Sequence, residues 1–218
     1  MKLLKTILSI IVIVYLLFVA RNAIILMSLS IKANNIINAQ NYYVRTIGYV
    51  GNNLLTIEYY KKGEDYYTTW DVCSRNSYTN RMDEVKITYY KKGEDKVSII
   101  EYDDRKEMQE ITESNKNWMS EYLYRPTSFL ENIKLAFFVG IETRECNGKE
   151  CYVIKEKELQ RYIDKETGIP VRNIADNIEN NSFGISSIVD FDYKFNVVQD
   201  NDIQRPDTTD AIIKNGIQ

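Results

Sequence analysis

The sequence contains no histidine, and this absence excludes several kinds of site. A Ser-His-Asp triad, a Cys-His pair and a His-ligated zinc ion all need an imidazole. Other catalytic motifs are missing too. Gly148-Lys149 lacks the upstream glycine of a phosphate loop, and Ser186 and Ser187 stand in an alternating strand pattern rather than a nucleophile elbow. We therefore expect a non-enzymatic protein, with no catalytic residues, no metal and no cofactor.

Proline and glycine are also scarce, with 3 and 9 residues among 218, so the chain has no low-complexity linker. Ile, Asn, Lys and Tyr are abundant, which is typical of an AT-rich bacterial genome. The formal charge is -3, and the first 31 residues hold three basic side chains and no acidic one. The remainder therefore carries a net charge of -6. Such a balance argues against nucleic acid and against peripheral binding to anionic lipid.

The chain has one long apolar run, Leu3–Ala20, with no charge after Lys5. As a helix this run would be about 27 Å long, close to the ~30 Å hydrocarbon core of a bilayer. Lys2 and Lys5 precede it, so the positive-inside rule places the N-terminus in the cytoplasm and exports the rest. We expect a single-pass protein of the cell membrane with an extracytoplasmic domain.

The apolar run favours an uncleaved signal anchor. Cleavage after Ala20 would place Phe18 where signal peptidase requires a small residue, and Ser28 and Ser30 lie well past the run. The alternatives are an ordinary cleaved secretory signal and a buried helix of a soluble protein. No cysteine lies near the N-terminus, so the sequence predicts no lipidated start.

Two copies of YYKKGED, at residues 59–65 and 89–95, each lie between apolar or aromatic runs. Both patterns predict a hairpin with a turn at the glycine. Strand composition begins at residues 42–50, directly after a helical pattern over residues 23–40. The first half is therefore expected to be an antiparallel strand series that follows an N-terminal helix.

Residues 115–139 change to a helical period that Pro126 interrupts. Ser128 and Glu131 have the spacing of a capping box for the second helix. The second half returns to strands, and residues 185–198 alternate between an apolar face that includes Val197 and a polar face that includes Asp190 and Asp192. The two aspartates could help to bind Ca²⁺, but their surroundings lack the glycine and terminal glutamate of a calcium loop, and solvated acids are the simpler interpretation.

Cys146 and Cys151 flank a tight turn. If Gly148-Lys149 were a two-residue loop, the cysteines would face each other across the hairpin, within reach of a disulfide that an exported domain permits. Two reduced thiols or a redox pair are the alternatives. Cys73 is the odd cysteine, and its pattern favours a buried small side chain over a reactive thiol.

Several large apolar residues are expected near the seam between the sheet and the helices. They could be plain core, or they could line a groove for an apolar ligand. The candidates are Trp70, Tyr102, Trp118, Met119, Leu123, Leu130, Phe137 and Phe138.

The order of these elements resembles the LolA/LppX-type fold. Three phrases carry the resemblance, namely NGKECYVIKEK (147–157), RYIDKETGIPVRNI (161–174) and DFDYKFNVVQDNDIQRPD (190–207). The group includes lipoprotein-localisation factors, lipid-carrier lipoproteins and periplasmic anti-sigma regulators. The resemblance implies an open half-barrel whose apolar concave face lies under helices and binds acyl chains or a protein partner.

The sequence thus predicts an α+β fold, with one large curved antiparallel sheet and helices on its concave face. A signal anchor would occupy residues 1–28, a LolA-like domain residues 29–207 and a tail residues 208–218. The expected partners are the membrane and an apolar ligand, either a lipid or a lipoprotein acyl chain. The alternative function is a protein-interaction or sensor module in cell-envelope regulation.

Overall fold

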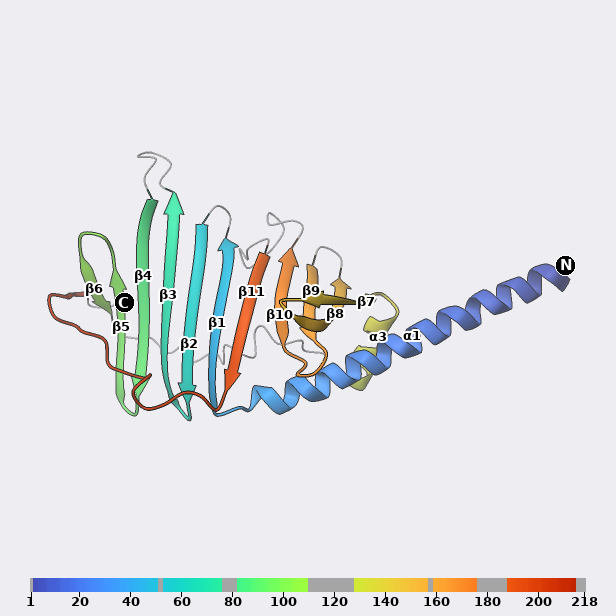
Figure 1. Cartoon of the computed structure of the whole chain (residues 1–218), viewed down its shortest axis with the longest axis horizontal. Coiled ribbons are helices and arrows are strands. Elements are labelled where there is room, and N and C mark those ends of the chain that lie inside the picture. The colour runs from blue at the N-terminus through green and yellow to red at the C-terminus, as the bar shows by residue number, and fades with distance from the viewer. Residues whose placement is uncertain are drawn as a thin grey trace. The chain divides into compact units, whose positions relative to one another are not determined.

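The computed structural model describes residues 2–50, 53–75, 82–109, 128–156, 159–175 and 188–214. Its helices are α1 (Lys2–Ile37) and α3 (Phe129–Ala136). The strands, shown in Figure 1, are β1 (Asn41–Val50), β2 (Asn53–Lys62), β3 (Asp65–Arg75), β4 (Met82–Lys92), β5 (Asp95–Glu101), β6 (Lys106–Gln109), β7 (Gly140–Cys146), β8 (Lys149–Glu156), β9 (Leu159–Asp164), β10 (Pro170–Ala175), β11 (Ile188–Phe195) and β12 (Ile212–Lys214). These elements confirm the predicted α+β class.

Hydrogen bonds join the strands in the order β12-β6-β5-β4-β3-β2-β1-β11-β10-β9-β8-β7, so the large open sheet is also confirmed. Every neighbouring pair along β6-β5-β4-β3-β2-β1-β11-β10 is antiparallel, and so are the pairs β9–β8 and β8–β7. The chain divides into two compact units. Unit 1 holds residues 1–38 and 117–171, and unit 2 holds residues 39–116 and 172–218. The predicted boundary after residue 28 falls inside α1, which continues without a break to Ile37.

The two YYKKGED segments form the same hairpin in unit 2. Lys62 pairs with Asp65 and Lys92 pairs with Asp95, so each loop has two residues and begins with a glycine at positive φ. Tight hairpin turns of this kind need a residue that adopts positive φ at low cost, and glycine does so. Local turn chemistry therefore sets the register of β2–β3 and of β4–β5.

The strands of unit 2 have two distinct faces. One face includes Tyr42, Ile57, Trp70 and Ile87, and the other includes Arg45, Glu58, Asp71 and Lys86. Tyr42 and Ile57 are buried, whereas the second set is exposed or half-buried. The alternation predicted for residues 185–198 is confirmed for Val189 and Phe191, which are buried on the first face.

The alternation fails at Val197, which we expected on the apolar face. Asn196 takes φ 58°, in the left-handed region, directly after β11 ends at Phe195. This residue turns the chain, so that Val198 is 4% exposed and Val197 is 48% exposed. A simple period of two cannot anticipate this change, because it assumes an unbroken strand.

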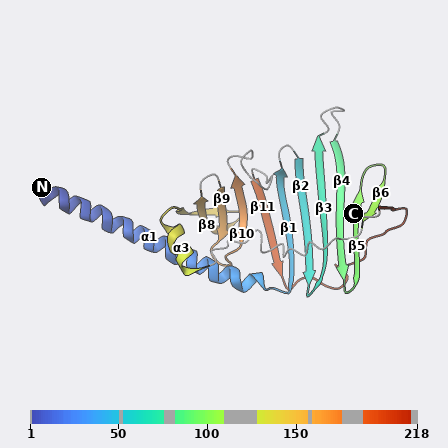
Figure 2. The same cartoon turned by 180° about the vertical axis from the view of Figure 1, so that it is seen from behind.

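Unit 1 packs α1 and α3 against β7, β8 and β9, and Figure 2 shows α3 lying along α1. Ser128 is the N-cap of α3, because the backbone N–H of Glu131 donates to Ser128 Oγ at 3.2 Å. The two residues of the predicted capping box also bond through their side chains, since Ser128 Oγ donates to Glu131 Oε2 at 3.1 Å. The first helix expected in residues 115–125 lies outside the described residues.

The predicted tail contains a further strand. Ile212–Lys214 forms β12, which pairs in parallel with Glu107–Gln109 of β6. The sheet is therefore mixed rather than wholly antiparallel. Without β12, strand β6 would be an edge strand with unpaired N–H and C=O groups, and β12 bonds to some of them.

Candidate functional site

Helix α1 has two halves with different surroundings. Every side chain from Leu3 to Phe18 is exposed, although all of these residues except Lys5, Thr6 and Ser9 are apolar or aromatic. From Val19 onward one side of the helix is buried. By length and composition α1 qualifies as a membrane-spanning helix near the N-terminus. The exposed half spans about 24 Å at 1.5 Å per residue.

The second half of α1 forms the core of unit 1. Leu26 and Leu29 are 0% exposed, and Val19, Ala23 and Ile25 are buried with them. They share one apolar cluster with Ala136, Val139, Ile141, Ile154 and Ile163. The second half therefore belongs to the folded domain as much as β7–β9 do.

Polar side chains of α1 bind the backbone that follows α3. Asn22 is 0% exposed, and its Nδ2 donates to the carbonyl oxygens of Val139 at 3.1 Å and Ala136 at 3.5 Å. Tyr15 Oη donates to Phe137 O at 3.3 Å, and Arg21 donates to Ile141 O at 3.3 Å. These bonds hold residues 136–141 along α1.

Sequence reasoning missed Tyr15 and Asn22. Both are polar residues in or next to the apolar run, and their i, i+7 spacing puts them on one side of a helix. That spacing was the available signal. Their partners are backbone carbonyls far along the chain, which no local pattern identifies.

The described residues that are expected to line one groove belong to two compact units. Trp70 and Tyr102 belong to unit 2, whereas Leu130, Phe137 and Phe138 belong to unit 1. Trp118, Met119 and Leu123 lie outside the described residues. Trp70 packs edge-on against Tyr89, and Arg105 stacks over the ring of Tyr102 at 4.1 Å. Leu130, Phe137 and Phe138 are 67%, 43% and 85% exposed.

A hollow of about 380 Å³ lies over β2–β5 in unit 2. Five charged residues contribute to its wall, and Asp71, Lys86 and Glu101 form one cross-strand row in it. The full lining is Leu54, Thr56, Asp71, Val72, Cys73, Glu84, Val85, Lys86, Glu101, Tyr102 and Asp103. The wall therefore combines apolar side chains with a charged row.

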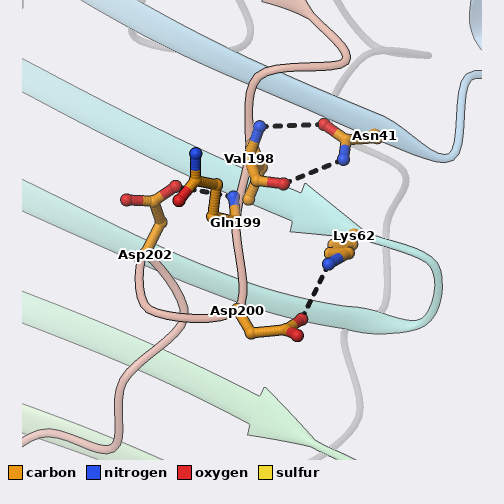
Figure 3. A network of polar contacts seen from close by, with 6 residues as sticks. All are labelled: Asn41, Lys62, Val198, Gln199, Asp200 and Asp202. Carbon is orange, nitrogen blue, oxygen red and sulfur yellow. Dashed lines mark hydrogen bonds and ion pairs between the residues drawn. The ribbon is translucent and has the colours of Figure 1, made fainter.

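The segment after β11 is fastened across the strands of unit 2. Val198 and Ile203 are buried against Tyr90, Val97 and Ile99. Figure 3 shows how Asn41 holds this segment: its Nδ2 donates to Val198 O at 2.9 Å, and Val198 N donates to its Oδ1 at 3.0 Å. Lys62 pairs with Asp200 at 2.8 Å and lowers the pKa of that carboxyl. Residues 197–203, which we call the strap, therefore cover the side of β4 and β5 that carries Tyr90, Val97 and Ile99.

Replacing Asn41 with alanine should loosen the strap. The change removes both bonds to Val198 and leaves its partly buried backbone groups unpaired, which costs about 1–3 kcal/mol. Hydrogen exchange at Val198 N–H should rise at least tenfold. Lys62→Ala is the matched control, because it removes only an exposed ion pair of the same strap, and exchange there should hardly change. Equal exchange in the two variants would contradict the role of Asn41.

Buried tyrosines make unit 2 sensitive to alkali. Burial raises the pKa of Tyr59 to about 12 and also raises that of Tyr42, whose ring centroid lies 5.7 Å away. The unfolded chain releases these phenolic protons near pH 10 while the folded chain retains them. The contribution to stability is therefore complete below pH 10 and is lost as the pH rises toward 12.

For Tyr59 the expected loss between pH 9 and pH 12 is about 2–3 kcal/mol, measured by urea unfolding at a series of pH values. Tyr59→Phe cannot titrate at this position and should lose less stability over the same interval. An identical pH dependence in both proteins would count against the buried phenol as the cause.

The expected geometry of the cysteine hairpin was wrong. Cys146 pairs with Lys149 and Cys151 pairs with Arg144, so the turn is Asn147-Gly148, and the cysteines are diagonal neighbours rather than facing residues. Asn147 and Gly148 both have positive φ, as the Asn-Gly hairpin turn requires. Among the described residues, no disulfide joins Cys73, Cys146 and Cys151. Burial raises the pKa of Cys151 to about 11, which keeps its thiol protonated and unreactive at neutral pH.

Asp190 forms an ion pair with Arg172. Arg172 donates to its two carboxylate oxygens at 2.6 and 3.0 Å, and Asp192 lies 3.8 Å from Lys194. These contacts favour the interpretation as surface acids over the calcium alternative. In the part of the chain that the structure describes, no cluster of three His, Cys, Asp or Glu residues suits a metal ion.

The fold and this site define a class of chain, in which a membrane-span-like helix continues into an open-sheet domain. No family model matches the chain, and a search of curated proteins found no match. Among solved structures it is similar to MucB, with 13% identity and a TM-score of 0.36 over 86% of this chain and 63% of that one.

It is also similar to the MucA/MucB complex of Pseudomonas aeruginosa, with 12% identity and a TM-score of 0.32 over 85% of this chain and 61% of that one. The chain spans less than two thirds of the length of both structures. At these values the likeness assigns neither a family nor a partner. The open α+β fold agrees with the LolA/LppX resemblance, and membership of that family stays a prediction.

Proposed function

We propose that this chain is a membrane-anchored extracytoplasmic binding domain without catalytic activity. The observation that carries the proposal is the continuity of α1. Its exposed apolar half, Leu3–Phe18, joins without a break to a half that is buried in the domain. Lys2 and Lys5 place its N-terminus in the cytoplasm by the positive-inside rule.

The buried half of α1 also supports a retained anchor. Cleavage near Ser28 or Ser30 would remove Leu26 and Asn22, and with them most of the contacts that α1 makes in the core of unit 1. A domain that lost these side chains would expose the apolar faces of β7–β9. Retention therefore serves folding as well as attachment.

Membrane fractionation and N-terminal sequencing of the mature protein test the anchor. We expect the protein in the membrane fraction after alkaline carbonate washing, with its N-terminus upstream of Leu3. A soluble mature protein that begins near Ile31 would overturn the proposal.

The proposed ligand is an apolar chain, such as a lipid or the acyl group of a lipoprotein. The support comes from half-buried apolar side chains on one face of unit 2. Leu55, Val72 and Val85 form one cross-strand row, and Trp70 and Ile87 belong to the next row. Side chains of this kind bind acyl chains through burial of apolar area.

Native mass spectrometry of the full chain in detergent, with lipid extraction, tests this ligand. We expect a co-purifying lipid and uptake of a fluorescent fatty acid, and Val85→Asp should abolish the uptake. Asp71→Asn, on the opposite face, should leave it unchanged. Absence of both lipid and uptake in the unmodified chain would sink the proposal.

A protein-interaction module is the second candidate, and the charged row of Asp71, Lys86 and Glu101 favours it. Crosslinking in cells separates the two functions. A single membrane-protein adduct that Lys86→Glu removes, without bound lipid, would favour the interaction module.

A further inference from the structure

Helix α3 carries an exposed apolar surface next to α1. Asn132 and Ala136 face the core of unit 1, whereas Phe129 and Leu130 are 64% and 67% exposed. Phe137 and Phe138 follow the helix and are 43% and 85% exposed. We call Phe129, Leu130, Phe137 and Phe138 the α3 apolar patch. A patch of four large apolar side chains in water indicates a surface that contacts something apolar.

The position of this patch along α1 is given by hydrogen bonds. Phe137 O accepts from Tyr15, and the two rings lie 6.2 Å apart, whereas Val139 O accepts from Asn22. Tyr15 lies six residues before Arg21, which corresponds to about 9 Å of helix. Phe137 and Phe138 thus lie beside the apolar half of α1, on the N-terminal side of Arg21. The other end of the patch lies beside the buried half, because Asn132 donates to Ser30 Oγ at 3.2 Å.

The length of the exposed half of α1 indicates how far a bilayer would extend along the helix. The exposed half, Leu3–Phe18, covers about 24 Å, less than the ~30 Å of a hydrocarbon core. A bilayer that solvates this half must therefore reach at least to Val19 and toward Arg21. Tyr15 and the end of α3 then lie within the outer leaflet.

Backbone carbonyls at this end of α3 already have hydrogen-bond partners within the protein. Carbonyls at a helix C-terminus usually bond to water, which lipid does not supply. Here Ala136 O and Val139 O accept from Asn22 and Phe137 O accepts from Tyr15. Leu135 O accepts from Phe138 N and Val139 N. Side chains of α1 thus satisfy carbonyls that would be costly to place in an apolar phase.

We infer that Phe137 and Phe138, the end of the α3 apolar patch that lies beside Tyr15, insert into the outer leaflet next to α1 and dock unit 1 on the membrane. The inference rests on the proposed anchor and adds a second contact to it. Because the patch is uncharged, the contact depends on acyl chains and not on anionic headgroups. Glu131 and Lys134 are exposed at other positions around α3, where headgroups and water can solvate them.

Site-specific labelling of the full chain in phosphatidylcholine nanodiscs tests this inference. An environment-sensitive fluorophore is attached at Phe138→Cys, in a background in which Cys73, Cys146 and Cys151 are replaced by serine or alanine. The quencher is a nitroxide on the lipid acyl chain. We expect blue-shifted emission and quenching of at least threefold, because the label at residue 138 lies among acyl chains.

Two further labels act as controls. Lys149→Cys lies in the exposed β7–β8 hairpin of the same unit and should show no quenching. Leu8→Cys lies in the apolar half of α1 and should be quenched as strongly as the label at residue 138. Quenching at residue 8 without quenching at residue 138 would overturn the docking of α3 and leave the anchor intact. Absence of quenching at residue 8 would overturn the anchor itself, and the docking with it.

Discussion

A chain shortened to begin at Ile31 is expected to leave unit 1 unfolded. The deletion removes Val19, Ala23, Ile25, Leu26 and Leu29, which form the α1 part of its core. Loss of a single large core side chain costs about 2–5 kcal/mol, and domains have only about 5–15 kcal/mol of net stability. The loss therefore exceeds what the unit can tolerate.

Hydrogen exchange of the amides of β7–β9 measures the effect, and protection there should vanish. A chain that begins at Val14 is the matched control. It lacks most of the exposed apolar half but keeps Tyr15 and every buried residue of α1, so protection should match the full chain in mild detergent. Native protection in the Ile31 chain would show that the second half of α1 is dispensable.

Leu26→Asp should be the most damaging single substitution in α1. Leu26 is 0% exposed, and a carboxylate at this place would be buried among apolar side chains without a partner. Such a charge costs several kcal/mol, so we expect a loss of at least about 3 kcal/mol in the free energy of unfolding.

Ile24→Asp is the control for charge and helix propensity, because Ile24 lies two residues away and is 69% exposed. It should change stability by less than about 0.5 kcal/mol. Urea unfolding of the full chain in detergent, followed by exchange in β7–β9, compares the variants. Similar losses in both would mean that α1 does not pack against unit 1 as described.

Much of the local structure was predictable because short-range chemistry specifies it. The two YYKKGED turns, the N-cap of α3 at Ser128, and the alternation around Val189 and Phe191 each depend on residues a few positions apart. The α+β class followed from these patterns, because strand and helix periods differ clearly.

The errors have two physical causes: residues that adopt positive φ, and contacts between residues far apart in the sequence. The register of the cysteine hairpin depended on which two residues take positive φ, and Asn147-Gly148 does so at lower cost than Gly148-Lys149. Val198 is buried in place of Val197 because one residue, Asn196, leaves the extended conformation. The pairing of β12 with β6 joins residues about a hundred positions apart, and no period in the sequence reports such a contact.

The sequence by itself determined that one apolar segment is followed by a strand-rich chain without histidine chemistry, because composition and periodicity are local properties. The tertiary structure decided that α1 is both span and core, since burial of Leu26 and Leu29 depends on strands more than a hundred residues away. It also decided where Tyr15 and Asn22 act. Their hydrogen-bond partners are backbone carbonyls at residues 136–139, and only the folded chain brings these groups together.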